Sequence, residues 1–158
     1  MRGSQTFKKY KSTMDKKIIK LKVVTPERVV YESEIYQVTL PTQAGEVTIL
    51  PNHRSYIASL KPGEIITKSE KGEEEISLAV AGGFVEFHDN SLVVLADEAH
   101  RAEEIDIEEV EKAKKRAEDI KNRVIQTDEM EYARVAASLE IEMAKLKVAQ
   151  RYMKRRGL

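Results

Sequence analysis

The chain has 158 residues, and its 27 Lys and Arg against 27 Asp and Glu give a formal net charge of zero. This length excludes a large multidomain enzyme, and the balanced charge disfavours a general nucleic-acid binder. The sequence holds no cysteine and three histidines that stand far apart, which excludes thiol catalysis and disfavours a metal site. We expect no catalytic residue, no metal and no cofactor. No apolar run approaches the roughly 20 residues that cross a bilayer.

Residues 1–15 are polar, basic and without periodicity, and a second methionine, Met14, directly precedes the first ordered pattern. We expect this leader to be disordered or added for expression, so it does not enter the fold argument.

From residue 17 to about residue 96 the apolar residues recur with a period of two, as in residues 19–23 and 76–80. All four prolines and six of the seven glycines lie before residue 84, mostly in breaks between such runs. This pattern predicts an antiparallel sandwich or barrel, which we place at residues 16–103. At Gly82 and Gly83 we expect a strand bend rather than a phosphate-binding loop, because no lysine follows.

After residue 105 the period becomes that of a helix. The first apolar stripe comprises Ile107, Val110, Ala113, Ala117, Ile120 and Val124. Asp106, followed by Glu109, forms a capping box that predicts the start of this helix. A turn is predicted at residues 126–128, and Asp128 with Glu131 forms a second capping box.

The second helix carries a stripe of its own. It comprises Tyr132, Ala136, Leu139, Met143, Leu146, Gln150 and Met153. The pattern predicts a long, one-sided helix, and residues 104–158 therefore form an antiparallel helical hairpin. Both stripes are narrow and rich in alanine, so at roughly 25 cal/mol per Å² they contribute little against the entropy of ordering the helices. We expect a marginally fixed hairpin that can detach.

Two blocks of opposite charge follow the strand-rich part. Residues 97–120 hold ten acids and five bases, a net charge of −5. The bases after Glu142, where no acid remains, are Lys145, Lys147, Arg151, Lys154, Arg155 and Arg156. One interpretation is a solvated face whose cations are favoured by the helix C-terminus. The other is an electropositive probe for an acidic partner surface, screened by salt.

Five segments, taken in chain order, resemble one protein family. They are residues 45–53 (GEVTILPNH), 60–65 (LKPGEI), 79–86 (AVAGGFVE), 93–97 (VVLAD) and 103–106 (EEID). They resemble the epsilon subunit of bacterial F-type ATP synthase, and the resemblance spans residues 17–158. It implies an all-β sandwich of about ten short antiparallel strands followed by a C-terminal α-helical hairpin.

The resemblance also implies a non-catalytic rotor subunit of the central stalk, at the cytoplasmic face of the bacterial membrane. Its expected partners are the gamma subunit, the c-ring and the catalytic alpha and beta subunits, with no nucleic acid. Carried over by residue, Glu46 and His53 would contact the c-ring. The hairpin would extend into the catalytic head and obstruct ATP hydrolysis, with the six basic residues after Glu142 contacting a beta subunit.

The residues leave more than one role open for His53. It could be an exposed contact, which is the interpretation that the resemblance favours, or a turn histidine whose ring packs under Tyr56. A ligand or catalytic role is disfavoured, because no acid-base constellation surrounds it in the sequence.

Some similar bacterial members bind ATP in the folded hairpin through an Ile/Leu-Asp-x-x-Arg-Ala motif. Ile105 and Asp106 match it, but Glu109 occupies the arginine position, and His100 stands where an upstream glutamate is usual. Arg116 remains, one or two helix turns further on. A cation is lost and an anion is gained, so this resemblance implies no tight ATP binding by Ile105, Asp106 and Arg116.

Two other functions compete with the rotor subunit. A free-standing adaptor would bind peptides through its sandwich and dimerise as a coiled coil. Its dimer contacts would be Leu139, Met143, Leu146 and Met153. A hydrolase would use His53 or His88 with nearby acids, but the motifs for it are missing.

Overall fold

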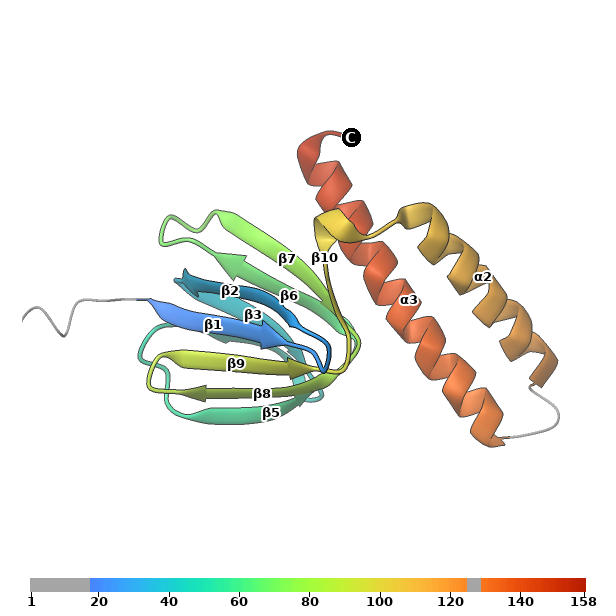
Figure 1. The fold of residues 1–158 in the computed structure, drawn as a ribbon, viewed down its shortest axis with the longest axis horizontal. Coiled ribbons are helices and arrows are strands. Elements are labelled where there is room, and N and C mark those ends of the chain that lie inside the picture. Colours follow the sequence, from blue (N-terminus) through green and yellow to red (C-terminus); the bar gives the residue numbers. More distant parts are fainter. Residues whose placement is uncertain (1–17, 125–128) are drawn as a thin grey trace, which may run out of the picture.

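The computed structural model describes residues 18–124 and 129–158 (Figure 1). The expected leader at residues 1–15, the turn at residues 126–128 and the capping residue Asp128 lie outside the described residues. The described part contains ten strands, then a short 3₁₀ helix, then two α-helices. An all-β sandwich followed by a C-terminal helical hairpin is thus confirmed as the fold class.

The strands are short and follow each other closely. They are β1 (Ile19–Val24), β2 (Val29–Ile35), β3 (Gln37–Thr42), β4 (Gly45–Ile49), β5 (Tyr56–Leu60), β6 (Gly63–Lys68), β7 (Glu74–Val80), β8 (Gly83–His88), β9 (Ser91–Ala96) and β10 (Ala99–Arg101). The 3₁₀ helix η1 (Ala102–Glu104) leads into α2 (Ile107–Val124) and α3 (Glu129–Arg156).

The strands form one hydrogen-bonded sheet that folds over on itself. Its order is β10-β7-β6-β3-β5-β8-β9-β1-β2, and β4 is added to β3. The sheet folds at β3, which pairs with β6 through residues 37–39 but with β5 only where Thr42 lies opposite Leu60. One layer is therefore β4-β3-β6-β7-β10, and the other is β5-β8-β9-β1-β2.

One pair of strands departs from the predicted antiparallel arrangement. β1 runs parallel to β9, with Lys20 opposite Ser91 and Val24 opposite Leu95. The other strand pairs in the described part are antiparallel. β1 and β9 are far apart in the chain, so no hairpin turn forces them to run in opposite directions.

Alternation along the strands places the core between the two layers. Leu21, Phe87 and Leu92 are fully buried, whereas the outward residues Lys20 and Glu86 are exposed. Burying one such apolar side chain contributes about 1.5–3 kcal/mol relative to leaving it exposed. All buried members of this core cluster belong to residues 19–99, so the sandwich has a core that includes no helix residue.

β7 departs from the predicted half-buried pattern. Its inward residues are buried as expected, but the outward Ser77 and Ala79 are buried as well. α3 covers this face of the sheet, and Ala79 packs with Val148 of that helix. The two small side chains give the helix room to lie close to the strand.

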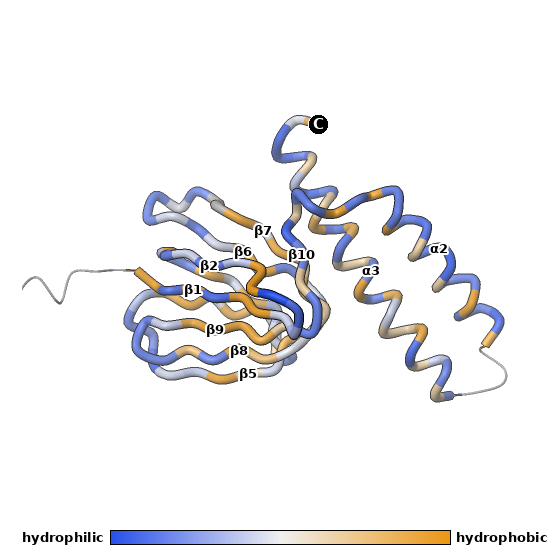
Figure 2. The backbone as a smooth tube through the Cα atoms, viewed as in Figure 1, coloured by the Kyte–Doolittle hydropathy of each residue, from blue (hydrophilic) through white to orange (hydrophobic). Residues whose placement is uncertain are grey.

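Asp106 caps α2 as predicted. Its Oδ1 accepts hydrogen bonds from the backbone N–H groups of Glu108 at 3.0 Å and Glu109 at 3.2 Å. Val110 and Ala117, both from the predicted stripe, are the buried residues of α2. The rest of this helix is largely hydrophilic (Figure 2).

The predicted one-sided stripe on α3 was wrong. Val148 and Ala149 are the buried residues of this helix, and neither belongs to that stripe. Met143 is 51% exposed, and Gln150 is exposed. α3 lies between α2 and the sandwich (Figure 1), so its apolar residues serve two narrow contacts on different faces instead of one.

The predicted bend at the glycine pair is confirmed at the turn from β7 into β8. Gly82 and Gly83 have φ values of 134° and 122°. A Cβ at Gly83 would lie 2.1 Å from the backbone oxygen of Leu95, so this position needs glycine both for its conformation and for the close approach of β9.

Candidate functional site

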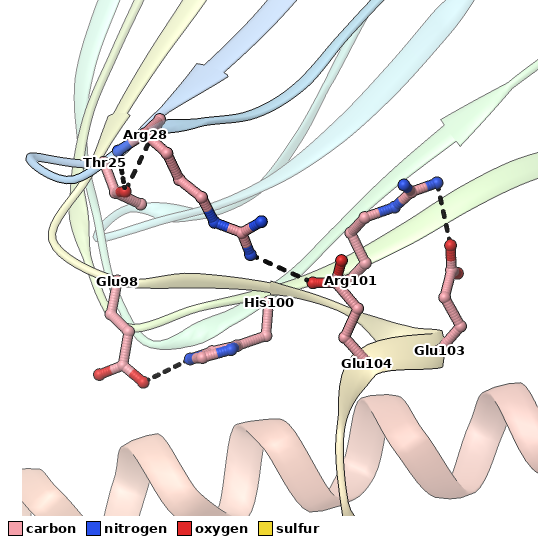
Figure 3. Close-up of polar contacts among 7 residues, drawn as sticks. All are labelled: Thr25, Arg28, Glu98, His100, Arg101, Glu103 and Glu104. Carbon is pink, nitrogen blue, oxygen red and sulfur yellow. Dashed lines mark hydrogen bonds and ion pairs between the residues drawn. The ribbon is translucent and has the colours of Figure 1, made fainter.

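A group of charged side chains joins α3 to the turn between β9 and β10. Nζ of Lys145 lies 2.5 Å from Oε1 of Glu98 and 3.4 Å from Oε1 of Glu142. The same oxygen of Glu98 lies 2.6 Å from Nε2 of His100. Figure 3 shows Glu98 and His100 reaching toward the neighbouring helix. Lys145, a predicted partner contact, is therefore engaged within the chain, and its side chain is only 15% exposed.

The environment favours the charged forms of both partners. Burial raises the pKa of Glu98, but the hydrogen bonds and positive charges of Lys145 and His100 outweigh burial and hold it below 4.5. Burial also acts to lower the pKa of Lys145, whereas its contacts with Glu98 and Glu142 raise it above 10.5. Lys145 and Glu98 therefore form an ion pair at neutral pH.

A second ion pair joins α3 to β6. Nη1 of Arg151 lies 2.8 Å from Oε2 of Glu64. The other carboxylate oxygen of Glu64 accepts a hydrogen bond of 2.5 Å from the hydroxyl of Ser77 on β7. The side chain of Glu64 is only 11% exposed, so Arg151 and Ser77 replace much of the water that this carboxylate has lost.

Two ion pairs on the sandwich side fix the path into the hairpin. Nη2 of Arg28, next to β2, lies 3.3 Å from Oε2 of Glu104, and Nη2 of Arg101 lies 2.9 Å from Oε1 of Glu103 (Figure 3). All four side chains are partly exposed, so each pair stabilises the fold by little. They link Arg28 and Arg101 to η1, where the chain leaves the sheet.

The apolar part of the joint is small. Ala79, Ala102 and Val148 form its buried cluster, and Ile105 and Tyr152 pack partly buried against them. Val148 is the only large side chain of this cluster that is fully buried. Few apolar side chains are thus buried in this joint, and detachment of the hairpin stays a prediction.

The remaining predicted beta-subunit contacts are exposed on α3. They are Lys147, Lys154, Arg155 and Arg156. The guanidinium groups of Arg155 and Arg156 lie 5.8 and 4.9 Å from the ring centre of Tyr152. The six predicted contacts thus divide into two that pair with the sandwich and four that lie outside those pairs.

A cavity of about 270 Å³ lies where α2, α3 and β10 meet. Of the predicted nucleotide residues, Ile105 and Asp106 line it, and Arg116 does not. Its charged lining consists of His100, Glu104, Asp106, Glu109, Glu142 and Lys145. A phosphate group would meet four carboxylates there, and the lysine is already paired with two acids.

Glu46 and His53 are not brought together. Glu46 lies at the start of β4, whereas His53 follows the end of that strand. At about 3.3 Å per residue, the three steps from Glu46 to the end of β4 at Ile49 span roughly 10 Å. Asn52 hydrogen-bonds to Asn90 of the β8–β9 turn, which lies at the end of the sandwich away from the helices (Figure 1). One partner contacting both predicted residues would have to extend along β4.

The ring of His53 is half-buried. It packs edge-on against Tyr56 and Phe87, with ring centroids 6.1 and 5.9 Å apart. Its Nδ1 lies 2.8 Å from the carbonyl oxygen of Arg54. A carbonyl oxygen only accepts hydrogen bonds, so Nδ1 is the donor in this contact. Packing against Tyr56 is observed, and the c-ring contact stays a prediction.

Sequence reasoning missed an apolar row on the outer face of the second layer. Phe84 lies opposite Leu95, Leu95 opposite Val24, and Val24 opposite Val29. Phe84 and Leu95 are 58% and 56% exposed, and Ile57 of β5 on the same face is 74% exposed. We call Val24, Val29, Ile57, Phe84 and Leu95 the apolar row. Val24 is partly exposed and the other four side chains are exposed, and a group of exposed apolar side chains of this kind is typical of a partner surface.

A sequence signal for the apolar row does exist. Residues 92–95 (LVVL) are apolar without alternation, as expected for a strand that is covered on both faces. Glu64, Ser77 and Glu98 were missed too, and they carry no such signal, because their pairing with α3 depends on how the helix lies on the sheet.

Ser55 and His88 form a pair that resembles part of a hydrolase site. The hydroxyl of Ser55 lies 2.9 Å from Nδ1 of His88. Both side chains are exposed, and within the described residues no carboxylate contacts the His88 ring to orient it. The pair therefore gives no support to the hydrolase hypothesis.

Within residues 18–124 and 129–158, no group of three or more His, Cys, Asp or Glu is placed to hold a metal ion. Neither of the two α-helices, as far as the structure describes them, has the length and apolar character needed to cross a membrane.

Two sequence models of one family match this chain in succession. The model described as "ATP synthase, Delta/Epsilon chain, beta-sandwich domain" matches residues 18–102. The model described as "ATP synthase, Delta/Epsilon chain, long alpha-helix domain" matches residues 103–150. The chain belongs to the ATP synthase delta/epsilon family. Both family domains occur here in one chain and in that order.

Relatives within the family are ATP synthase epsilon chains. One from Dehalococcoides mccartyi is 44% identical over 137 residues, which cover 86% of this chain and 95% of the relative. Another, from Ligilactobacillus salivarius, is 38% identical over 137 residues, covering 86% and 98%. The resemblance to the bacterial epsilon subunit is thereby confirmed.

Chains in two solved ATP synthase structures are similar to this chain. A chain in the OSCP/F1/c-ring structure of the Euglena gracilis mitochondrial ATP synthase matches with a TM-score of 0.70 and 25% identity, covering 84% of this chain and 81% of that one. A chain in the central stalk and c-ring structure of the Tetrahymena thermophila mitochondrial ATP synthase matches with a TM-score of 0.51 and 14% identity, covering 83% and 96%. The second match supports the fold alone.

Proposed function

We propose that this epsilon-type chain is a non-catalytic rotor subunit that couples the gamma subunit to the c-ring in proton-driven ATP synthesis. Its hairpin detaches and inhibits ATP hydrolysis. The observation that carries the proposal is the contrast between a sandwich with its own core and a hairpin held by one small apolar cluster and two ion pairs. Transmitting torque needs a rigid body, and inhibition needs an element with two positions.

The sandwich supplies the two rotor contacts. The apolar row suits the gamma subunit, because two subunits that turn together need a permanent interface, and permanent interfaces are the more hydrophobic ones. Glu46 and His53 suit the polar loops of the c-ring. Through these contacts the chain is a peripheral protein at the cytoplasmic face of the bacterial membrane.

The hairpin supplies the regulatory contact. Extended into the catalytic head of alpha and beta subunits, α3 would bring its basic residues to an acidic segment of a beta subunit. Nucleotide has no evident part in this movement, because the cavity at the joint presents four carboxylates to an incoming phosphate.

The adaptor alternative has less support. Leu139 and Leu146, two of its four dimer contacts, are already half-buried in a chain whose α3 packs against its own α2. A coiled-coil dimer would have to break that contact first.

The experiment that tests the proposal compares ATP hydrolysis by the assembled complex with the full chain and with a chain lacking residues 105–158. The truncated chain keeps the sandwich core, so it should still co-purify with gamma, and hydrolysis should rise. Unchanged hydrolysis would contradict the inhibitory role, and failure of the full chain to co-purify with gamma would contradict the rotor role.

A further inference from the structure

Two of the six basic residues of α3 already have acidic partners in the docked hairpin. Lys145 pairs with Glu98 at 2.5 Å, and Arg151 pairs with Glu64 at 2.8 Å. Glu98 lies in the turn before β10, and Glu64 lies on β6. The sandwich therefore presents two separate carboxylates to one helix, on either side of the apolar contact made by Val148.

Two other basic residues of α3, Lys147 and Lys154, take no part in these two pairs. They lie four residues before and three residues after Arg151, so they share the side of the helix that carries Arg151, opposite to Lys145. Both are exposed in the docked hairpin. Docking therefore buries most of the Lys145 side chain and pairs Arg151, which stays 45% exposed, with Glu64, while Lys147 and Lys154 stay accessible.

We infer that Glu64 and Glu98 form an internal acidic docking site that competes with the acidic surface of the catalytic head for Arg151 and Lys145. The inference rests on the proposed inhibitory function and specifies its regulation. One ammonium and one guanidinium group cannot satisfy both sets of carboxylates at once, so the two positions of the hairpin exclude each other at these two residues.

The burial of Glu64 makes the site more than a pair of surface contacts. In the docked hairpin the Glu64 side chain is only 11% exposed, so its attraction to Arg151 is screened less by water than that of a surface pair, and this attraction is lost when α3 leaves. The sandwich thus opposes release of the hairpin, and an outside partner must offer carboxylates that replace both pairs.

The direct test measures docking in the isolated full chain. The chain has no cysteine, so spin labels at Ser91→Cys, on the sandwich, and Glu129→Cys, at the start of α3, report one distance. The variant Glu64→Gln/Glu98→Gln keeps the shapes of both side chains and removes their charges. The matched control, Glu34→Gln/Glu86→Gln, changes the net charge equally at exposed sites on β2 and β8.

We expect the Glu64→Gln/Glu98→Gln variant to shift the ratio of docked to undocked chains by roughly tenfold to a hundredfold, since charged hydrogen bonds of this kind are lost. The control should keep the distance distribution of the parent chain. Raising the salt concentration should release the hairpin of the parent chain and the control, but have much less effect on the variant. A variant that docks as well as the control would overturn the inference.

A second measurement separates this inference from the proposed function. In the assembled complex, the Glu64→Gln/Glu98→Gln variant should lower ATP hydrolysis, because Lys145 and Arg151 become available to the catalytic head. Released docking with unchanged hydrolysis would overturn the competition for these two residues. If, in addition, removing residues 105–158 leaves hydrolysis unchanged, the inhibitory function itself fails.

Discussion

Nζ of Lys145 lies 2.5 Å from Oε1 of Glu98, and this contact ties the middle of α3 to the turn between β9 and β10, the last strand of the sandwich. The same lysine approaches Glu142 of its own helix, and the same carboxylate approaches His100. Lys145 is thus both a docking residue and a predicted inhibitory residue. Which of the two roles it fulfils depends on where the hairpin is.

The docking of the hairpin should weaken in acid as Glu98 becomes protonated. The pKa of Glu98 is depressed below 4.5, so its contribution is fully present above pH 4.5 and is lost as the pH falls through the lower, folded-state value. The pKa of Lys145 is raised, so its contribution is fully present below pH 10.5 and is lost only as the pH rises further.

A pH titration of the distance between the labels at residues 91 and 129 checks this. Glu98→Gln should remove the part of the acid-induced release that belongs to this pair, and Lys145→Gln should remove the alkaline part. The other titratable groups near the pair are His100 and Glu142, together with the acids that line the cavity. An acid release that is identical in the parent chain and Glu98→Gln would contradict the assignment.

Val148→Ala should release the hairpin without unfolding the sandwich. The substitution removes two methyl groups from the small cluster that Val148 forms with Ala79 and Ala102. At ~0.8 kcal/mol per methylene-sized group, this should weaken the docking free energy by about 1.5 kcal/mol. The cluster between the layers includes no helix residue, so the thermal melt of the sandwich should stay in place. Val29→Ala, at an exposed position, is the control. Equal docking in both variants would contradict the claim that the Val148 cluster holds the hairpin on the sandwich.

Replacing Phe84 and Leu95 by glutamine should weaken binding of the gamma subunit by at least tenfold, because an apolar contact near the centre of an interface carries much of its affinity. Their side chains are more than half exposed in the isolated chain, so its melting temperature should change little. Binding can be measured by titration with purified gamma subunit. Leu50→Gln, another exposed apolar position outside the row, is the control, and a gamma affinity equal to that of this control would exclude the row as the interface.

His53→Ala should lower the free energy of unfolding by about 1 kcal/mol, since the ring packs edge-on against Tyr56 and the buried Phe87. Glu46 is exposed at the start of β4, so Glu46→Gln should leave stability unchanged. Urea unfolding measures the stability of both variants. Assembly with the c-ring tests the predicted contact of Glu46 and His53. If neither variant reduces c-ring assembly, the predicted contact is wrong.

Local patterns were sufficient to predict that a strand-rich part precedes a helical part, and where α2 starts. The alternation in β1 and the Asp106 cap depend on neighbours in the chain, and both occur as predicted. The parallel pairing of β1 with β9 and the burial of Ser77 depend on elements that meet only in the folded chain, and both were missed.

The same distinction between neighbours in the chain and contacts in the folded chain explains which parts of the site were predicted. The basic residues of α3 were found because charge is visible in a sequence, but the division between Arg151, which pairs with Glu64, and Lys154, which does not, follows from the orientation of the helix on β6 and β7. The one-sided stripe on α3 failed for a related reason. A helix between two neighbours needs two apolar faces, and a search for one stripe does not find them.

The most direct test of the account is to fix the hairpin in its docked position. The chain has no cysteine of its own, so Glu64→Cys/Arg151→Cys can be bridged by a short reducible crosslinker before the complex is assembled. ATP hydrolysis by the crosslinked complex should equal that of the complex lacking residues 105–158, and it should fall when the crosslink is reduced. Equal hydrolysis before and after reduction would contradict a detachable, inhibitory hairpin.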